Sequence, residues 1–244
     1  MKNISIVSVD MFQTLVDVSS RRYRLWKRLL NKKYSMHLAE EYWSLATELI
    51  FKNYDELFRR GKEFISCRAI MEMSFRELFL EVGLNLNPEE GARILVEEHG
   101  LASPYEDTKM FFEIVGKRFP ICVVSDADDD MIQPLIKLYK FDKVFTSEQY
   151  QAYKGSPGSK IFRAVIDYYG IRPEKILHIG DSKYDVLGAS RAGLKNCWLN
   201  RKGRKWQSEE ARPAYTVTSL HEAAALLEKK SNPLWKKQPL IDFK

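Results

Sequence analysis

Short apolar runs alternate with helical patterns along most of the chain. Five of these runs have the length and composition of buried strands, and they lie at residues 4–10, 121–126, 143–146, 176–181 and 196–200. The segments between them carry apolar residues at helical spacing, so that strands and helices alternate. Such alternation is typical of a parallel sheet that is covered by helices. The pattern therefore predicts an α/β fold with a doubly wound parallel sheet.

The segment 18–102 interrupts this alternation, because it shows helical spacing and no strand pattern. Its apolar and aromatic residues recur three or four positions apart, as Leu38 and Tyr42 do. The run Asn-Pro-Glu-Glu at 87–90 predicts a helix start, since asparagine caps a helix, proline fits its first turn and the helix dipole favours early acids. We expect about four helices here, forming an inserted all-helical subdomain.

These patterns divide the chain into three parts. We predict an α/β core at 1–17 and 103–228, a helical insertion at 18–102, and a C-terminal tail at 229–244. The tail contains two prolines and little periodicity, so no helix or strand is predicted for it.

Composition limits the classes of protein to consider. The 244 residues are 45% hydrophobic and 30% charged, which is ordinary for a globular protein of one large or two smaller domains. No apolar run approaches the roughly 20 residues of a membrane-spanning helix, and the N-terminus lacks the pattern of a signal peptide. Cys67, Cys122 and Cys197 are scattered and lack metal-ligand spacing, which suits a reducing compartment. We expect a cytoplasmic protein.

The net charge of +6 raises the question of a nucleic-acid partner. The basic residues are spread among the predicted helices, and no nucleic-acid motif accompanies them, so we expect neither a nucleic-acid nor a membrane partner. One basic segment, NRKGRKW at 200–206, follows the last predicted strand. It would either concentrate an anionic substrate at the rim of the sheet or form a solvated loop. The oligomeric state is not evident from the sequence.

Acidic residues stand at the ends of several predicted strands. Asp10, Asp126 and Asp181 each end one, and Asp185 follows four residues after Asp181. Open parallel sheets bind ligands at the carboxyl ends of their strands, so these carboxylates would meet. The alternative is that each one only caps the helix that follows it. Clustered carboxylates need a cation or protons, and Mg²⁺ prefers such oxygen ligands, so the pattern predicts a Mg²⁺ site.

Four segments in order resemble the motifs of the haloacid dehalogenase superfamily. They are DMFQTL at 10–15, the serine at 125, the lysine in YKGSPGSKIF, and HIGDSKYDVLGASRAG at 178–193. The resemblance covers 1–17 and 103–225, and the helical insertion lies where this superfamily carries its helical cap. It implies a Rossmann-like hydrolase core with an all-helical cap.

The resemblance also implies roles for individual residues. Asp10 would be the nucleophile and would form a covalent aspartyl intermediate. Its second carboxylate oxygen, the backbone carbonyl of Phe12 and the carboxylate of Asp181 would bind Mg²⁺. Asp185 would be a further ligand, either directly or through water.

Two more roles follow from the same resemblance. Ser125 would donate a hydrogen bond to the transferred group. Lys154 would compensate negative charge at the nucleophile and in the transition state. Lys160 is a rival for that lysine, because the segment after Lys154 is longer than usual.

Phe12 departs from the phosphatase pattern. Phosphatases of this superfamily carry a second aspartate there, which protonates the leaving group and activates water. Losing such a group costs ~10²- to 10⁴-fold in rate. The dehalogenase branch has an aromatic residue at this position and works without metal, but its last motif lacks the acids found here. A cap histidine, His37 or His99, could also supply the missing group.

The acids of the last motif decide the interpretation that we favour from sequence. It is a Mg²⁺-dependent hydrolase, a phosphatase that acts on a small phosphorylated metabolite through Asp10. One alternative is a metal-independent hydrolase of the 2-haloacid dehalogenase type. The other is a non-catalytic binding protein that retains the metal-binding residues.

Overall fold

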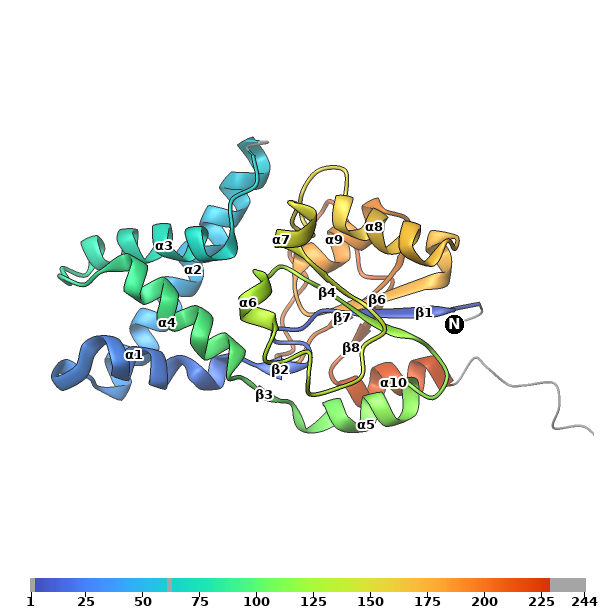
Figure 1. The fold of residues 1–244 in the computed structure, drawn as a ribbon, viewed down its shortest axis with the longest axis horizontal. Helices are drawn as coiled ribbons and strands as arrows, with labels where there is room; N and C mark the ends of the chain where they lie inside the picture. Colours follow the sequence, from blue (N-terminus) through green and yellow to red (C-terminus); the bar gives the residue numbers. More distant parts are fainter. Residues whose placement is uncertain (1–2, 61–62, 229–244) are drawn as a thin grey trace, which may run out of the picture.

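The computed structural model describes residues 3–60 and 63–228 of the chain. The predicted tail at 229–244 lies outside the described residues. Figure 1 shows a sheet covered by helices on both faces, with a further group of helices beyond the carboxyl ends of its strands.

The sheet has six strands in the order β5-β4-β1-β6-β7-β8, and each neighbouring pair is parallel. Their bounds are β1 Ile6–Val9, β4 Ile121–Ser125, β5 Val144–Thr146, β6 Ile176–Gly180, β7 Lys195–Leu199 and β8 Tyr215–Val217. All five predicted strands are present, and the predicted parallel α/β fold is confirmed. β8 was not predicted, because its three residues, of which only Val217 is buried, do not form a continuous apolar run.

Side chains of each strand alternate between two apolar layers. Ile6 and Val124 face the layer of α8 and α9, whereas Val7 and Val123 face the layer of α5 and α10. The helices of the α/β core are α5 Glu106–Val115, α6 Asp129–Ile132, α7 Ser147–Tyr150, α8 Lys160–Tyr169, α9 Lys183–Arg191 and α10 Leu220–Glu228, with a 3-10 turn η3 at Pro173–Lys175. Because both faces are covered, most strand residues are apolar, with a few buried polar exceptions such as Ser8 and His178.

The inserted segment is helical, as predicted, and packs as a cap beside the sheet. It contains α1 Arg22–Leu30, α2 Met36–Arg60, α3 Cys67–Glu81 and α4 Pro88–Gly100, with 3-10 turns η1 Ser19–Arg21 and η2 Asn31–Lys33. The side chain of Asn87 accepts a hydrogen bond from the backbone N–H of Glu89 at 3.0 Å, so the predicted helix start is confirmed. Trp26 packs edge-on against Tyr42 and Phe75 in the centre of this cap.

The cap leaves and rejoins the sheet side by side. Strands β2 (Val16–Asp17) and β3 (Ser103–Pro104) pair antiparallel and join the two connections. This places the cap over the carboxyl ends of the central strands. The boundaries that we predicted for core and cap remain a prediction.

No helix among the described residues is both long enough and apolar enough to cross a bilayer. The longest, α2, has 25 residues and carries charged residues along its length. The cytoplasmic location remains a prediction.

Asp128 fastens the cap to the core. Its two carboxylate oxygens accept hydrogen bonds from the backbone N–H groups of Cys67 and Arg68, both at 2.8 Å, at the first turn of α3. Asp130 also reaches Arg68, but it does so as an exposed ion pair. Of these two aspartates, only Asp128 accepts from backbone donors that the helix itself leaves unpaired.

We predict that Asp128→Ala lowers the free energy of unfolding by about 1–2 kcal/mol, the usual cost of losing a helix cap. Asp130→Ala is the matched control and should cost less than about 0.5 kcal/mol, because exposed ion pairs contribute little. Urea denaturation of the two variants measures this difference. Equal losses in both would show that Asp128 does not anchor the helix.

Candidate functional site

A cavity of about 200 Å³ lies between the carboxyl ends of the strands and the cap. The core lines it with the polar side chains of Asp10, Asp126, Lys154, Asp181 and Ser182. The cap lines it mainly with apolar and aromatic side chains, which are Val18, Trp43, Ile50, Phe51, Tyr54, Met71 and Leu95. The cavity is smaller than the ~300–1,000 Å³ typical of sites for drug-sized ligands, so it suits a small molecule.

Asp10, Ser125 and Lys154 come together, as the sequence predicted. The carboxylate oxygen Oδ1 of Asp10 accepts a hydrogen bond from Lys154 Nζ at 2.7 Å and one from Ser125 Oγ at 3.3 Å. All three residues are buried. Lys160, the rival, is exposed at the start of α8. Geometry therefore places Lys154 at the site, while the role of each residue remains a prediction.

Local packing explains how Lys154 arrives there. Its backbone N–H donates to Asp126 Oδ1 at 2.8 Å, which ties its segment to the end of β4. A Cβ on Gly188 would lie 2.2 Å from the backbone oxygen of Lys154, so only glycine lets α9 approach this closely. The close packing of α9 against the backbone of Lys154 thus explains why the last motif has glycine at position 188.

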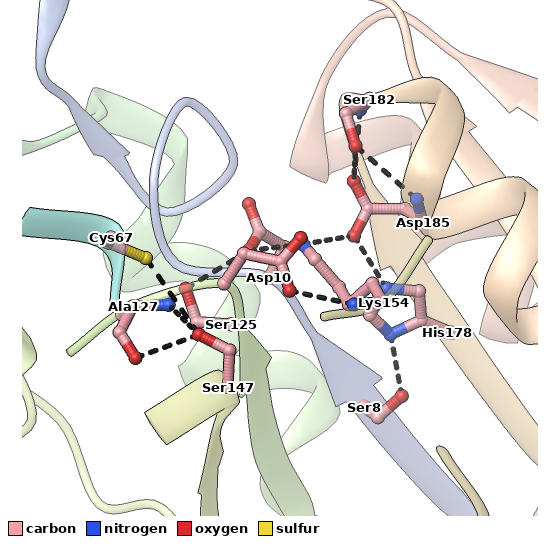
Figure 2. Close-up of polar contacts among 11 residues, drawn as sticks. Ser8, Asp10, Cys67, Ser125, Ala127, Ser147, Lys154, His178, Ser182 and Asp185 are labelled. Carbon is pink, nitrogen blue, oxygen red and sulfur yellow. Dashed lines mark hydrogen bonds and ion pairs between the residues drawn. The ribbon is translucent and has the colours of Figure 1, made fainter. Parts of the chain in front are cut away.

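Asp185 lies behind this group and faces the protein. Its Oδ2 accepts hydrogen bonds from the backbone N–H and the hydroxyl of Ser182, at 3.0 and 2.5 Å, at the start of α9. Its Oδ1 accepts one from Lys154 Nζ at 2.6 Å and one from His178 Nε2 at 2.9 Å (Figure 2). A carboxylate has about four acceptor positions, so the protein itself occupies those of Asp185.

Charge explains the protonation states of this cluster. Burial raises the pKa of Asp10, and the ammonium of Lys154 opposes that rise. Burial also acts on Asp185, but Lys154 and the hydrogen bond from His178 outweigh it and hold the pKa of Asp185 below its usual value. Although burial disfavours the ammonium, Asp10 and Asp185 raise the pKa of Lys154 well above its ordinary value. Lys154 is therefore a cation between two carboxylates.

Asp181 and Asp126 lie on either side of Asp10. Burial, with the charges of Asp10 and Asp185, raises the pKa of Asp181 to about 8. Burial raises the pKa of Asp126 to about 7. The carboxylate of Asp181 has Arg204 Nη2 at 3.8 Å, and its side chain remains 19% exposed. Both carboxyl groups can therefore exchange protons near neutral pH.

The donor set tests the predicted Mg²⁺ site. Ligand atoms of Asp10, Asp181 and Asp185 lie within 4.8 Å of one another, so the predicted carboxylates do meet. However, Asp185 is not among the residues that line the cavity, and its oxygens are bound by Ser182, His178 and Lys154. Because Lys154 already bonds to Asp10 and Asp185, the three carboxylates are not one free ligand set, and the Mg²⁺ site expected at Asp10, Phe12, Asp181 and Asp185 remains a prediction.

Phe12 contacts His99, a residue of the cap. Its ring lines the cavity and packs edge-on against the ring of His99, with centroids 5.0 Å apart. His99 Nδ1 lies 2.8 Å from the backbone oxygen of Leu95, and burial lowers the pKa of His99 to about 4. His99 is therefore neutral at pH 7 and cannot act as an acid there. His37, the other cap candidate, is 88% exposed on α2.

His178 is the site residue that sequence reasoning missed. It is buried on β6, as expected, but it also contacts Asp185 and Ser8. Its only sequence signal was its place two residues before the last motif's glycine, which a packing residue would share. The cap aromatics lining the cavity, such as Trp43 and Tyr54, gave no signal either.

Comparison with known proteins identifies the family. Residues 4–193 match the haloacid dehalogenase-like hydrolases, and the chain belongs to this family. It is 24% identical over 229 residues to an (S)-2-haloacid dehalogenase of Pseudomonas fluorescens, an alignment that covers 91% of this chain and 96% of that protein. A 90-residue segment is 40% identical to pyrimidine 5'-nucleotidase YjjG of Escherichia coli strain K12, covering 36% of this chain and 38% of that protein.

A solved structure resembles the chain over nearly its full length. It is the L-2-haloacid dehalogenase of Xanthobacter autotrophicus with chloropropionic acid covalently bound. The TM-score is 0.80 at 17% identity, and the match covers 93% of this chain and all of the other. At this identity the likeness establishes the fold.

The phosphatase favoured from the sequence is wrong. An (S)-2-haloacid dehalogenase matches over nine-tenths of both chains, whereas the nucleotidase matches over about a third. The phosphorylated substrate expected with that function is withdrawn as well. The error came from giving the acids of the last motif more weight than Phe12.

Asp181 should make the stability of the fold depend on pH. Its folded pKa of about 8 lies above the ordinary 3.8, so its ionisation destabilises the folded state progressively as pH rises from about 4 to about 8. We predict that Asp181→Asn raises the melting temperature at pH 8 by about 2–4 °C, roughly 1 kcal/mol, and changes it little at pH 4. The figure is modest because water reaches part of the side chain.

Asp167→Asn, on the exposed face of α8, is the control and should behave like the unmodified protein at both pH values. Thermal melts between pH 4 and pH 8 give the comparison. Parallel curves for Asp181→Asn and the unmodified protein would contradict the assigned shift.

Proposed function

We propose that this chain is a hydrolytic dehalogenase of small 2-halogenated carboxylic acids and that Asp10 is its nucleophile. The observation that carries the proposal is Phe12 in the same cavity as a buried Asp10 that is bonded to the ammonium of Lys154. An alkoxide leaving group needs a proton, which Phe12 cannot give. A halide leaves as a stable anion and needs none.

The relatives support this reading. The protein from Pseudomonas fluorescens is named an (S)-2-haloacid dehalogenase, and the one from Xanthobacter autotrophicus holds chloropropionic acid covalently. A covalent intermediate needs a buried nucleophile at the end of a small cavity, and Asp10 occupies such a position.

The reaction follows from the two oxygens of Asp10. Oδ1 is held by Lys154 and Ser125, so Oδ2 is the oxygen left to attack. It bonds to C2 of the substrate as the carbon–halogen bond breaks, and halide departs with the bonding pair. Attack opposite the halogen inverts C2. Water then adds to the carboxyl carbon of the Asp10 ester, releasing the 2-hydroxy acid and a proton and restoring the carboxylate.

The same contacts serve both steps. Apolar cap side chains exclude water from Asp10, which leaves its carboxylate less solvated and more reactive. During ester hydrolysis negative charge develops on Oδ1, where Lys154 and Ser125 already donate. Asp181, with an oxygen within 4.8 Å of Asp10, is the candidate to accept the proton from water. Lys154 supplies the positive charge, and no step is assigned to a metal.

The carboxylate of the substrate also needs a cation. Among the described residues that line the cavity, Lys154 is the one cation, and it is bonded to Asp10 and Asp185. Arg204 reaches Asp181 from a neighbouring hollow that shares Asp181 with the cavity. Asn200 fixes the backbone of Arg204 through two hydrogen bonds, of 2.8 and 2.9 Å. We assign Arg204 to the substrate carboxylate.

The proposed function predicts that the protein releases halide from 2-chloropropionate in the presence of EDTA and that it prefers one enantiomer. Asp10→Asn should abolish release, and Lys154→Met should slow it at least about 10²-fold, because it removes the charge at Oδ1. Lys160→Met is the matched control and should leave the rate unchanged. In a single turnover in H₂¹⁸O, the label should enter Asp10, as mass spectrometry of the peptide would show.

Absence of release from every 2-haloacid, with and without Mg²⁺, would overturn the proposal. Stabilisation by 2-haloacids without turnover would then indicate a binding protein on this fold. Label entering the product and not Asp10 would overturn the covalent route alone.

The proposed role of Arg204 gives a separate prediction. Arg204→Met should raise KM for 2-chloropropionate roughly tenfold with little change in kcat, because a charged hydrogen bond is worth about 1.5–3 kcal/mol and this site is partly exposed. Lys202→Met, an exposed cation on the same loop, should have no effect. An equal rise in KM for 2-chloropropionamide, which lacks the charge, would contradict the assignment.

A further inference from the structure

A line of buried polar side chains runs from the middle of the sheet to the nucleophile. Ser8 on β1 contacts His178 on β6, which contacts Asp185, then Lys154 and finally Asp10 (Figure 2). The four contacts are 2.8, 2.9, 2.6 and 2.7 Å long. Ser8 and His178 are wholly buried, and the reaction proposed above uses neither.

The sheet register creates the first contact. Ser8 and His178 are direct partners on neighbouring parallel strands, so their side chains project on the same face. That face is mostly apolar, with Ile6, Val124 and Ile176 around the pair. Phe162 packs edge-on against the His178 ring, at 4.8 Å. Two polar groups in such a layer lower the stability of the fold unless they are hydrogen-bonded, and these two groups are hydrogen-bonded to each other.

The chemistry of the acceptor fixes the ring's orientation. An ionised Asp185 can only accept hydrogen bonds, so His178 Nε2 must carry a hydrogen and donate it. In a neutral ring, Nδ1 is then the acceptor, and the Ser8 hydroxyl, at 2.8 Å, is its donor. Ser8 thus selects the Nε2–H tautomer, and this tautomer directs a donor at Asp185.

Lys154 lies between two competing carboxylates. Its ammonium bonds to Asp10 at 2.7 Å and to Asp185 at 2.6 Å. His178 and Lys154 both donate hydrogen bonds to Oδ1 of Asp185. Because this oxygen is shared between two donors, it attracts the Lys154 ammonium less strongly. Without His178, Asp185 would draw Lys154 towards itself and away from Asp10.

We propose that His178, oriented by Ser8, is a positioning residue that fixes Asp185 and thereby keeps the Lys154 ammonium on the nucleophile Asp10. The proposal rests on the function proposed above for its kinetic readout. The structural readout does not depend on that function. His178 touches no reacting atom and acts through Asp185 and Lys154.

Kinetic variants separate positioning from mere packing. His178→Leu should lower kcat for halide release about 10²-fold with KM nearly unchanged, because a displacement near 1 Å at the reacting group costs that much. His178→Gln keeps an N–H donor near the position of Nε2 and should recover most of the rate. Ser8→Ala should lower kcat several-fold, and Ser8→Thr, which keeps the hydroxyl, should not. His221→Leu, an exposed histidine on α10, is the control.

A structural readout tests the same idea without turnover. ¹⁵N-histidine spectra of the unmodified protein should show His178 as the Nε2–H tautomer, and Ser8→Ala should give a mixture of tautomers. A crystal structure of His178→Gln should retain both Lys154 contacts, and one of His178→Leu should show Lys154 displaced from Asp10. If dehalogenation itself is not found, this arm still decides the positioning role.

A purely structural role predicts other results. His178→Leu would then change the melting temperature alone, with kcat unchanged in the folded protein and Lys154 in place. That outcome, or an Nδ1–H tautomer in the unmodified protein, would overturn the proposal. Should His178→Leu fail to fold, the Ser8→Ala and His178→Gln pairs decide it.

Discussion

The site depends on two ion pairs, which the ammonium of Lys154 forms with Asp10 and with Asp185. Four carboxyl groups surround the ammonium, of which Asp10 and Asp185 are buried and Asp126 and Asp181 are partly buried. Removing one partner from such a buried group leaves an uncompensated charge, which is strongly destabilising. The cation holds the pKa of Asp185 below its usual value and opposes the rise that burial gives Asp10, while burial raises the pKa of Asp126 to about 7 and that of Asp181 to about 8. The sheet supports this arrangement from behind, through the hydrogen bonds that fix Asp185.

The cap makes these charges effective. Its aromatic and aliphatic side chains line the cavity that contains Asp10, and such apolar surroundings strengthen each electrostatic contact inside. The cap is tied to the core by polar contacts at several points, among them Asp128 with α3, and Asp55 of α2 with Lys183 and Tyr184. Core and cap thus divide the work, since the core supplies the charges and the cap supplies the apolar surroundings.

Phe12 and the last motif pointed to different reactions, and the structure shows why the motif was misleading. The spacing of Asp181 and Asp185 ensures that both carboxylates lie near Asp10, but spacing does not say which oxygens remain free. Hydrogen bonds from Ser182, His178 and Lys154 turn Asp185 into a support for the lysine. Phe12, in contrast, meets the neutral ring of His99, and neither of these two residues offers a proton to a leaving group at neutral pH.

The sequence by itself determined the sheet, the helical cap and the gathering of Asp10, Ser125, Asp181 and Asp185. Those features follow from local periodicity and from the rule that parallel strands end at one edge, which act over short stretches of chain. Tertiary structure alone decided that Lys154 and not Lys160 reaches Asp10, that His99 meets Phe12, and that Ser8 pairs with His178. These contacts join residues up to 170 positions apart, and they depend on strand register and helix packing that no local pattern records.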